Sequence, residues 1–219
     1  MCKNYQNKSV LQKLTFSPFI INKTPAKKIA YIAVVTAFLT VCNTLLEFSL
    51  FDAQYSLTIA TSAIAGILIG PLSGFASCMF ADAIGFLMNS KGGIYMLWVG
   101  LAIAVTSFLA GVIFHFIRFK FKGAVFVKLA LICIASFTVG TVLINTTGFY
   151  MYNYYVVGLP IAFLEYVSTT LGTSANYLTY LIYRLFFKGL IFNCLVNYGL
   201  IFVLTPMIIS TPIFKKDLQ

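Results

Sequence analysis

The stretch LTIATSAIAGILIGPLSGFASCMFADAIGFLM, residues 57–88, decides how often the chain crosses a membrane. It contains a single charged residue, Asp82, yet it is too long for one span of about 20 apolar residues. Gly70-Pro71 stands at its middle. Proline cannot donate the helical hydrogen bond, and glycine tolerates the turn that ends a helix. We therefore predict two short helices, 57–70 and 72–88, joined by a tight turn.

The composition of the whole chain indicates a membrane protein. Of its 219 residues, 60% are hydrophobic and 9% are charged, whereas a soluble domain is typically about half apolar and a quarter charged. These values exclude a disordered protein, a secreted disulfide scaffold and a DNA-binding domain. The net charge of +10 is better explained by cytoplasmic loops than by a nucleic-acid partner. We predict an all-α integral membrane protein that lies in a lipid bilayer.

Further uncharged stretches predict the remaining membrane helices. We place them at residues 29–46, 92–116, 129–150 and 189–209, with the last one starting earlier, near Tyr177. Together with the pair in 57–88, they make six transmembrane helices.

The basic residues predict which side each connection faces. Six precede the first helix, four lie in or beside the loop 118–128, and two follow the last helix. Cytoplasmic segments carry an excess of Lys and Arg, and all three segments share one side only if four helices precede Arg118 and two follow it. We therefore predict cytoplasmic termini in a bacterial plasma membrane. The parts are a basic tail at 1–28, a membrane domain at 29–210 and a tail at 211–219.

Enzyme motifs are missing from the sequence. It has no G-x-x-x-x-G-K-[ST] motif for ATP hydrolysis. Its one histidine, His115, cannot form a zinc site that needs at least two histidines and an acid. Five cysteines lie scattered without paired spacing, which favours apolar packing over metal binding. We predict a protein that is not an enzyme and uses no cofactor or metal, with His115 as an interfacial packing residue.

Two acidic residues fall at the predicted spans. Glu47 lies near the outer end of the first helix, and Asp82 lies in the outer half of the third. An ionisable residue within a span is costly unless it is paired or hydrated, so it is a functional candidate. The alternative is a structural ion pair with Arg184 or Lys188, which are four positions apart on one face of the predicted last helix.

Polar and aromatic residues gather at the predicted outer ends of the helices. A flat heterocycle would stack on the rings, while amides and backbone groups would read its edges. Arg184, Lys188 and Lys91 would attract a carboxylate, the arginine through a bidentate fork. An aromatic belt at the headgroup level is the alternative, and it explains Tyr154 and Tyr155 best. The candidate ligand-binding residues are Asn89, Lys91, Gly92, Gly93, Tyr95, Trp98, Asn145, Tyr152, Arg184 and Lys188.

The first helix carries small residues in its cytoplasmic half. Ala33 and Ala37 lie four positions apart on one face, and such small-xxx-small faces let helices approach closely in lipid. Together with a polar pocket at the outer side, this pattern favours a binding protein that meets a protein partner at its inner side.

Four pieces of the sequence carry a family resemblance. They are Ala33-x-x-x-Ala37, the stretch 63–88 with its Ala-Asp-x-x-Gly-Phe ending, NSKGGIY at 89–95, and INTTGFYMY at 144–152 with YRLFFKGLIFN at 183–193. In this combination the chain resembles the substrate-binding S components of energy-coupling-factor (ECF) vitamin transporters, most closely the folate-specific group. The resemblance touches most of residues 30–204.

The resemblance implies a six-helix protein that binds a vitamin at its outer face and topples in the membrane to release it inside. Its partners would be two ATPases and a transmembrane coupling protein, which in that family contacts the Ala33-x-x-x-Ala37 pattern. Folate is the leading substrate. The segment 155–176, which carries Glu165, and the N-terminal tail are longer than the family pattern. Cobalamin, thiamin or a queuosine precursor therefore stay open, as do a self-sufficient proton-coupled transporter and a structural membrane protein.

Overall fold

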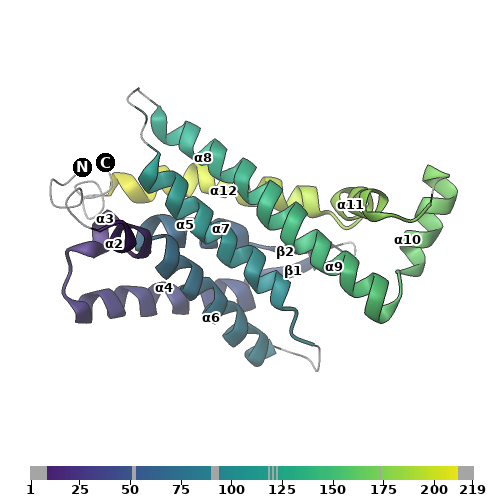
Figure 1. The fold of residues 1–219 in the computed structure, drawn as a ribbon, viewed down its shortest axis with the longest axis horizontal. Helices are drawn as coiled ribbons and strands as arrows, with labels where there is room; N and C mark the ends of the chain where they lie inside the picture. Colours follow the sequence, from purple (N-terminus) through teal and green to yellow (C-terminus); the bar gives the residue numbers. More distant parts are fainter. Residues whose placement is uncertain are drawn as a thin grey trace.

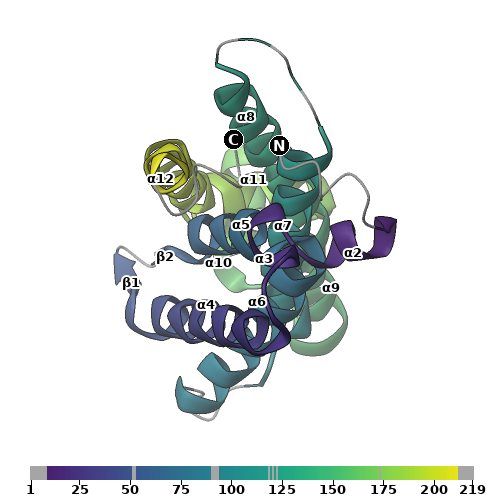
Figure 2. The same ribbon diagram turned by 90° about the vertical axis from the view of Figure 1, so that its left-hand side faces the viewer.

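The computed structural model describes residues 9–50, 53–89, 94–117, 119, 121, 123–172 and 174–211, which form an elongated bundle of helices (Figures 1 and 2). Among these residues, five helices are long and apolar enough to cross a membrane. They are α4 (Pro25–Leu45), α6 (Pro71–Asn89), α7 (Leu97–Phe116), the continuous helix Ala124–Val157 and α12 (Leu190–Ser210). A shorter apolar helix, α5 (Thr58–Ile69), accompanies them. The chain is a helical, multi-pass membrane protein.

The turn between α5 and α6 confirms the two-helix prediction for residues 57–88. Gly70 separates the helices with a φ of +114°, a conformation that favours glycine. Glycines also let the neighbouring helices approach closely. A Cβ on Gly74 would lie 2.8 Å from the Cα of Gly66, and one on Gly66 would lie 1.9 Å from the backbone oxygen of Ser107 in α7.

Residues 9–24 pack against this turn and do not form an extended tail. They form α2 (Val10–Thr15) and α3 (Pro18–Ile21). The N–H of Ser17 donates to the carbonyl of Ile69 over 3.1 Å, and Ile20 is fully buried. The part of the predicted 1–28 tail that the structure describes therefore belongs to the bundle, and α4 begins at Pro25 within it.

A β-hairpin follows α4, where the sequence analysis placed the end of a helix. Strands β1 (Glu47–Leu50) and β2 (Ala53–Ser56) pair antiparallel, with Phe48 opposite Tyr55. Glu47 lies near the end of the first helix, as predicted: α4 ends at Leu45, and Glu47 follows two positions later as the first residue of β1. Apolar and polar residues alternate through both strands, which is the period of a strand and not of a helix.

The second half of the chain holds one long helix and several short ones. The long helix comprises α8 (Ala124–Ala135), the π-helix η1 (Ser136–Thr146), α9 (Thr147–Tyr152) and η2 (Asn153–Val157), so it extends beyond the predicted 129–150 at both ends. It is followed by α10 (Ile161–Tyr166), η3 (Val167–Leu171) and α11 (Tyr177–Phe186).

The predicted last helix is two helices. Gly189, with a φ of +63°, separates α11 from α12, because a left-handed residue cannot continue a right-handed helix. Arg184 therefore lies in α11 and Lys188 in the turn after it. The expectation that the two cations share one helix face is wrong.

The two ends of the bundle differ in what they contain. Helices α2 and α3, the α5–α6 turn, the end of α7, the start of α8 and the end of α12 lie together at one end, here called the closed end (Figure 1). The hairpin, α9 and α11 lie toward the other (Figure 1). Helix α7 packs at the centre, whereas α4 lies at the edge, as the end-on view shows (Figure 2).

Candidate ligand-binding site

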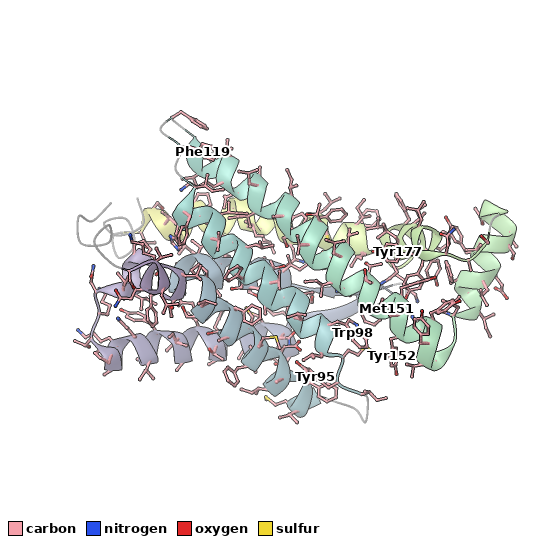
Figure 3. All side chains as sticks on the ribbon, viewed as in Figure 1. Tyr95, Trp98, Phe119, Met151, Tyr152 and Tyr177 are labelled. Carbon is pink, nitrogen blue, oxygen red and sulfur yellow. The ribbon has the colours of Figure 1, made fainter. Side chains whose placement is uncertain are left out.

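A cavity of about 690 Å³ opens at the end of the bundle opposite the closed end, here called the cavity end. Its volume falls within the range of about 300–1,000 Å³ that small-molecule sites occupy. Figure 3 places Tyr95 and Tyr152, both of its lining, far from Phe119, which lies at the closed end. Its walls come from the ends of α4 and α6, the starts of α5, α7 and α12, the η1–η2 region, and α11.

The shortness of α5 explains why a cavity forms here. At about 1.5 Å per residue, a helix of 12 residues covers only part of the length of its neighbours. The chain completes the distance with the extended strand β2, which is thinner than a helix. Thr58 and Ile59, at the first turn of α5, line the cavity together with Ser56.

A buried amide from α12 fixes this first turn in place. The Oδ1 of Asn197 accepts a hydrogen bond from the N–H of Ala60 over 2.9 Å, and its Nδ2 donates to the carbonyl of Ser56 over 2.7 Å. The side chain thus does the work of an N-cap for α5, since the residue before the helix, Leu57, has no polar side chain. Asn193, one turn earlier, lines the cavity and accepts from the N–H of Ser56 over 3.3 Å.

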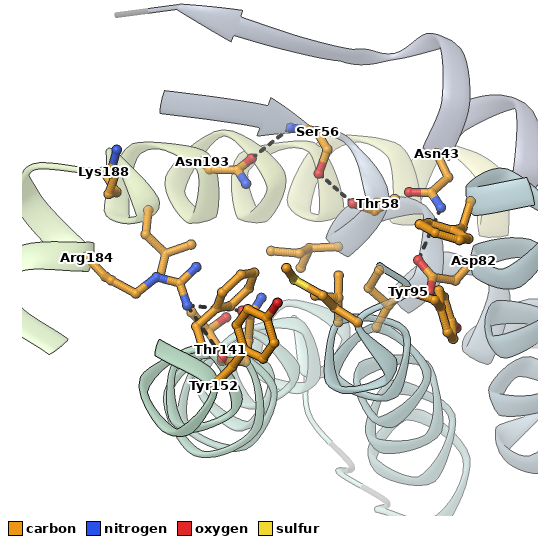
Figure 4. A pocket seen from close by; sticks show the side chains of 18 of the residues that line it. Asn43, Ser56, Thr58, Asp82, Tyr95, Thr141, Tyr152, Arg184, Lys188 and Asn193 are labelled. Atoms are coloured by element: carbon orange, nitrogen blue, oxygen red, sulfur yellow. Dashed lines mark hydrogen bonds between the residues drawn. The ribbon is translucent and has the colours of Figure 1, made fainter. Parts of the chain in front are cut away.

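One side of the cavity is basic. The Nη1 of Arg184 donates to the backbone oxygen and the Oδ1 of Asn145, over 3.4 and 3.3 Å. Its guanidinium lies 4.2 Å from the ring centre of Phe149, a cation–π distance. The partners that the structure describes for Arg184 are thus uncharged. Lys188 also lines this side (Figure 4).

The opposite side of the cavity is acidic. Asp82 is buried, and its Oδ1 accepts from the Nδ2 of Asn43 over 3.3 Å while its Oδ2 accepts from the hydroxyl of Tyr95 over 2.9 Å. Burial raises the pKa of Tyr95 to about 12, and the neighbouring carboxylate contributes, so this hydroxyl remains a donor near neutral pH. The described partners of Asp82 are neutral. For Asp82, the alternative of an ion pair with Arg184 or Lys188 is wrong, since these cations lie across the cavity (Figure 4).

The long segment between the fifth predicted helix and α11 supports the basic side. Phe163 of α10 and Val167 of η3 are buried against Tyr180 and Tyr183 of α11. This small aromatic core holds α11 against the end of the long helix. The segment 155–176, which looked long in the sequence, thereby positions the helix that carries Arg184.

The structure brings together several of the residues that the sequence predicted for a site. Those that line the cavity are Asp82, Tyr95, Asn145, Tyr152, Arg184 and Lys188. Tyr154 and Tyr155 are exposed, as an aromatic belt would have them. Lys91, Gly92, Gly93 and the side chains of Glu47 and Asn89 lie outside what the structure describes.

Trp98 supports the cavity wall instead of lining it. Its ring lies 5.5 Å from that of Tyr152 and 5.9 Å from that of Phe149, measured between centres. A Cβ on Gly148 would come within 2.3 Å of the indole, so glycine is what lets α9 pack onto this ring. The expectation that Trp98 stacks directly on a ligand is therefore replaced by a role behind Tyr152.

Sequence reasoning missed the uncharged polar residues of the cavity. Asn43, Asn193 and Thr141 lie within apolar helices and line it. An amide in an otherwise apolar span requires hydrogen-bond partners. The pair Asn193 and Asn197, one helical turn apart in α12, was the available indication.

His115 and the cysteines that the structure describes are not among the residues that line the cavity. His115 is buried, and its Nε2 is 2.9 Å from the carbonyl oxygen of Ile67, which agrees with a packing role. The free cysteines Cys42, Cys78, Cys133 and Cys194 are buried. The side chains that the structure describes include no group of three or more His, Cys, Asp or Glu residues placed to hold a metal ion.

The fold and the cavity define a multi-pass membrane protein with a polar and aromatic cavity at one end. The chain matches no family model and no curated protein. What the cavity binds is therefore argued from its own chemistry.

Proposed function

We propose that the protein is a vitamin-binding S component of an ECF-type importer, with folate as its leading substrate and ATP hydrolysed by partner subunits. The observation that carries this proposal is the cavity of about 690 Å³ with a half-buried arginine whose described partners are all neutral. A half-buried guanidinium without an acid beside it is stabilised by a ligand that supplies a carboxylate. Folate carries such carboxylates on its glutamate.

The walls of the cavity suit a flat heterocycle. Tyr95, Tyr152, Phe86 and Phe149 line it, and amides and hydroxyls lie among them. Ring faces stack on a pterin while polar groups read its edge. Cobalamin, much the bulkiest of the candidate vitamins, suits this volume least. Thiamin and a queuosine precursor remain comparison ligands.

For the topology, we propose six spans with α5 as the short one, cytoplasmic termini, and a bacterial plasma membrane as the location. The closed end would then face the cytoplasm, where the basic segments at 23–28 and around the α7–α8 junction lie in sequence. The cavity would open on the outer side, from which a vitamin arrives.

Helix α4 offers the surface for the coupling protein. Ala33 and Ala37 are exposed, as are the larger apolar side chains of Val34 and Phe38 on the same helix. Only 11% of the apolar stretch of α4 is buried in the protein, whereas 44% of the corresponding stretch of α7 is buried. An apolar helix with small residues on its outward face can pack closely against another membrane helix.

Isothermal titration of the detergent-purified protein tests the substrate. We expect folate to bind, and cobalamin to give no heat. Replacing Arg184 by Ala should weaken folate at least about tenfold, as expected for the loss of charged hydrogen bonds. Exposed Lys27 offers a matched control, and K27A should bind as wild type does. Absence of folate binding, or an unchanged affinity in R184A, would remove the folate assignment.

A self-sufficient transporter is the second candidate, because the buried carboxylate of Asp82 lines the cavity and could carry a proton. Uptake by the lone protein in liposomes would distinguish the two. An S component gives no uptake without its ATPases, whereas a proton-coupled carrier gives uptake that follows an imposed pH gradient.

A further inference from the structure

Two opposite charges face one cavity from opposite sides, and neither has a charged partner among the residues that the structure describes (Figure 4). From this we infer that the cavity holds one elongated ligand in a fixed orientation. Its edge with paired N–H donors lies on Asp82, and its anionic group lies at the opposite end, on Arg184. This inference rests on the proposed function and adds to it the orientation and the double-ended character of the substrate.

The acidic side has unused acceptor capacity. A carboxylate offers about four acceptor positions on its two oxygens. Asn43 occupies one on Oδ1, and Tyr95 occupies one on Oδ2. One position therefore remains on each oxygen, and Asp82 lines the cavity. Two adjacent N–H groups, such as those of an aminopyrimidinone or amidine edge, match this arrangement.

The basic side has unused donors. A guanidinium carries five N–H groups, and the hydrogen bonds that the structure gives Arg184 all come from Nη1. The ring of Phe149 covers one face of the planar guanidinium, and this contact fixes the plane of the group. The edge that remains is suited to a carboxylate or phosphate. Exposed Lys188 adds a second positive charge at the rim.

The rest of the lining that the structure describes is uncharged. It combines amides and hydroxyls with the apolar and aromatic side chains of Val99, Ile103 and Tyr152, so the middle of the ligand needs a flat or apolar body rather than further charge. The acidic and basic sides of the cavity would then bind the two ends of the ligand and set its orientation.

Electrostatics explains why the protein would keep the two charges apart. A charge removed from water is costly unless it is paired, and pairing offsets that cost only with good geometry. If Asp82 and Arg184 met, they would neutralise each other and the cavity would lose its selectivity. Held apart, each of the two side chains can bind a ligand group of opposite charge or matching hydrogen-bonding capacity. Only a ligand that carries the two groups at the right separation pairs with Asp82 and Arg184 together.

Fragments of folate separate the two contacts. Pterin carries the N–H edge alone, and 4-aminobenzoylglutamate carries the carboxylates alone. Their affinities, and that of whole folate, are measured by calorimetry for wild type, D82N and R184Q. Exposed Glu165 and Lys27 provide charge-matched controls in E165Q and K27Q.

The orientation predicts opposite selectivities in the two variants. D82N should weaken folate and pterin by the same factor, about tenfold to a hundredfold, and leave 4-aminobenzoylglutamate within about twofold. R184Q should weaken folate and 4-aminobenzoylglutamate and spare pterin. Each variant's unchanged fragment shows that it is folded. In the double variant the two losses on folate should multiply, because the sites do not touch.

Three results would overturn the inference. They are a wild-type affinity for folate in D82N, an equal weakening of both fragments by both variants, and losses on folate that do not multiply in the double variant. A wild-type protein that binds none of the three ligands would instead remove the proposed function, and the inference with it. The unmutated protein gives that answer before any variant is made.

Discussion

The two ends of the bundle are built from similarly apolar helices but differ in how these helices pack. At the closed end, Gly66, Gly70 and Gly74 bring helix backbones together, and α3 covers the turn with the fully buried Ile20. At the cavity end, α5 is replaced by a strand, and the space that it leaves is lined by amides, rings and two opposite charges. Tight packing at one end thus supports a polar opening at the other. Substitutions at the closed end should affect stability, and those at the cavity end should affect binding.

Gly66 gives the strongest test of the closed end. A Cβ at this position would lie 1.9 Å from the backbone oxygen of Ser107, and backbone cannot move aside cheaply. We expect Gly66→Ala to destabilise the fold by about 3 kcal/mol and to lower the thermal midpoint in detergent by about 6–12 °C. Gly199 of α12 has nothing within 4 Å of such a Cβ. An equal loss in Gly199→Ala would show that close packing is not the cause.

Asn197 tests whether the cavity end depends on its buried amide. Replacing it with Ala leaves the N–H of Ala60 and the carbonyl of Ser56 without this partner, which should cost about 1–3 kcal/mol. Folate affinity should also fall, since the first turn of α5 forms part of the wall. Thermal unfolding and calorimetry check the two effects. Asn22→Ala, at an exposed amide, should change neither, and a fully stable N197A would refute the capping role.

Ala37 should show the smallest effect on binding and a complete effect on transport. Its side chain is exposed on α4 and does not line the cavity, so Ala37→Trp, like Ala33→Trp, should leave folate affinity within about twofold of wild type. Uptake by cells that contain the coupling protein and ATPases should cease, because a bulky ring prevents close helix contact. Val203→Trp, at an exposed site on α12, is the control. Uptake that survives in A37W would place the docking surface elsewhere.

Sequence reasoning found what depends on local chemistry. The α5–α6 turn was predictable because the dipeptide Gly70-Pro71 is a strong local signal for a helix end, and Asp82 stood out because charge is rare in a span. The break at Gly189 was not, since an isolated glycine in an apolar stretch is also tolerated inside a helix. Arg184, a residue predicted for the site, lines the cavity, but Lys188 does not share its helix.

The hairpin and the amide network depend on contacts between distant segments. Asn197 reaches Ser56 across 141 positions of sequence, and no local pattern connects the two. The role of Trp98 was likewise decided by Gly148, fifty positions away in sequence, which admits the indole behind Tyr152.

Trp98 makes the most direct test of the central claim that the cavity binds folate. It is the single tryptophan of the chain, and its ring lies 5.5 Å from that of Tyr152 in the cavity wall. Folate added to the purified protein should therefore change the tryptophan fluorescence along a saturable curve with one site per protein, and R184A should shift that curve at least about tenfold to higher folate. A strictly linear, unsaturable change that is identical in wild type and R184A would contradict the account.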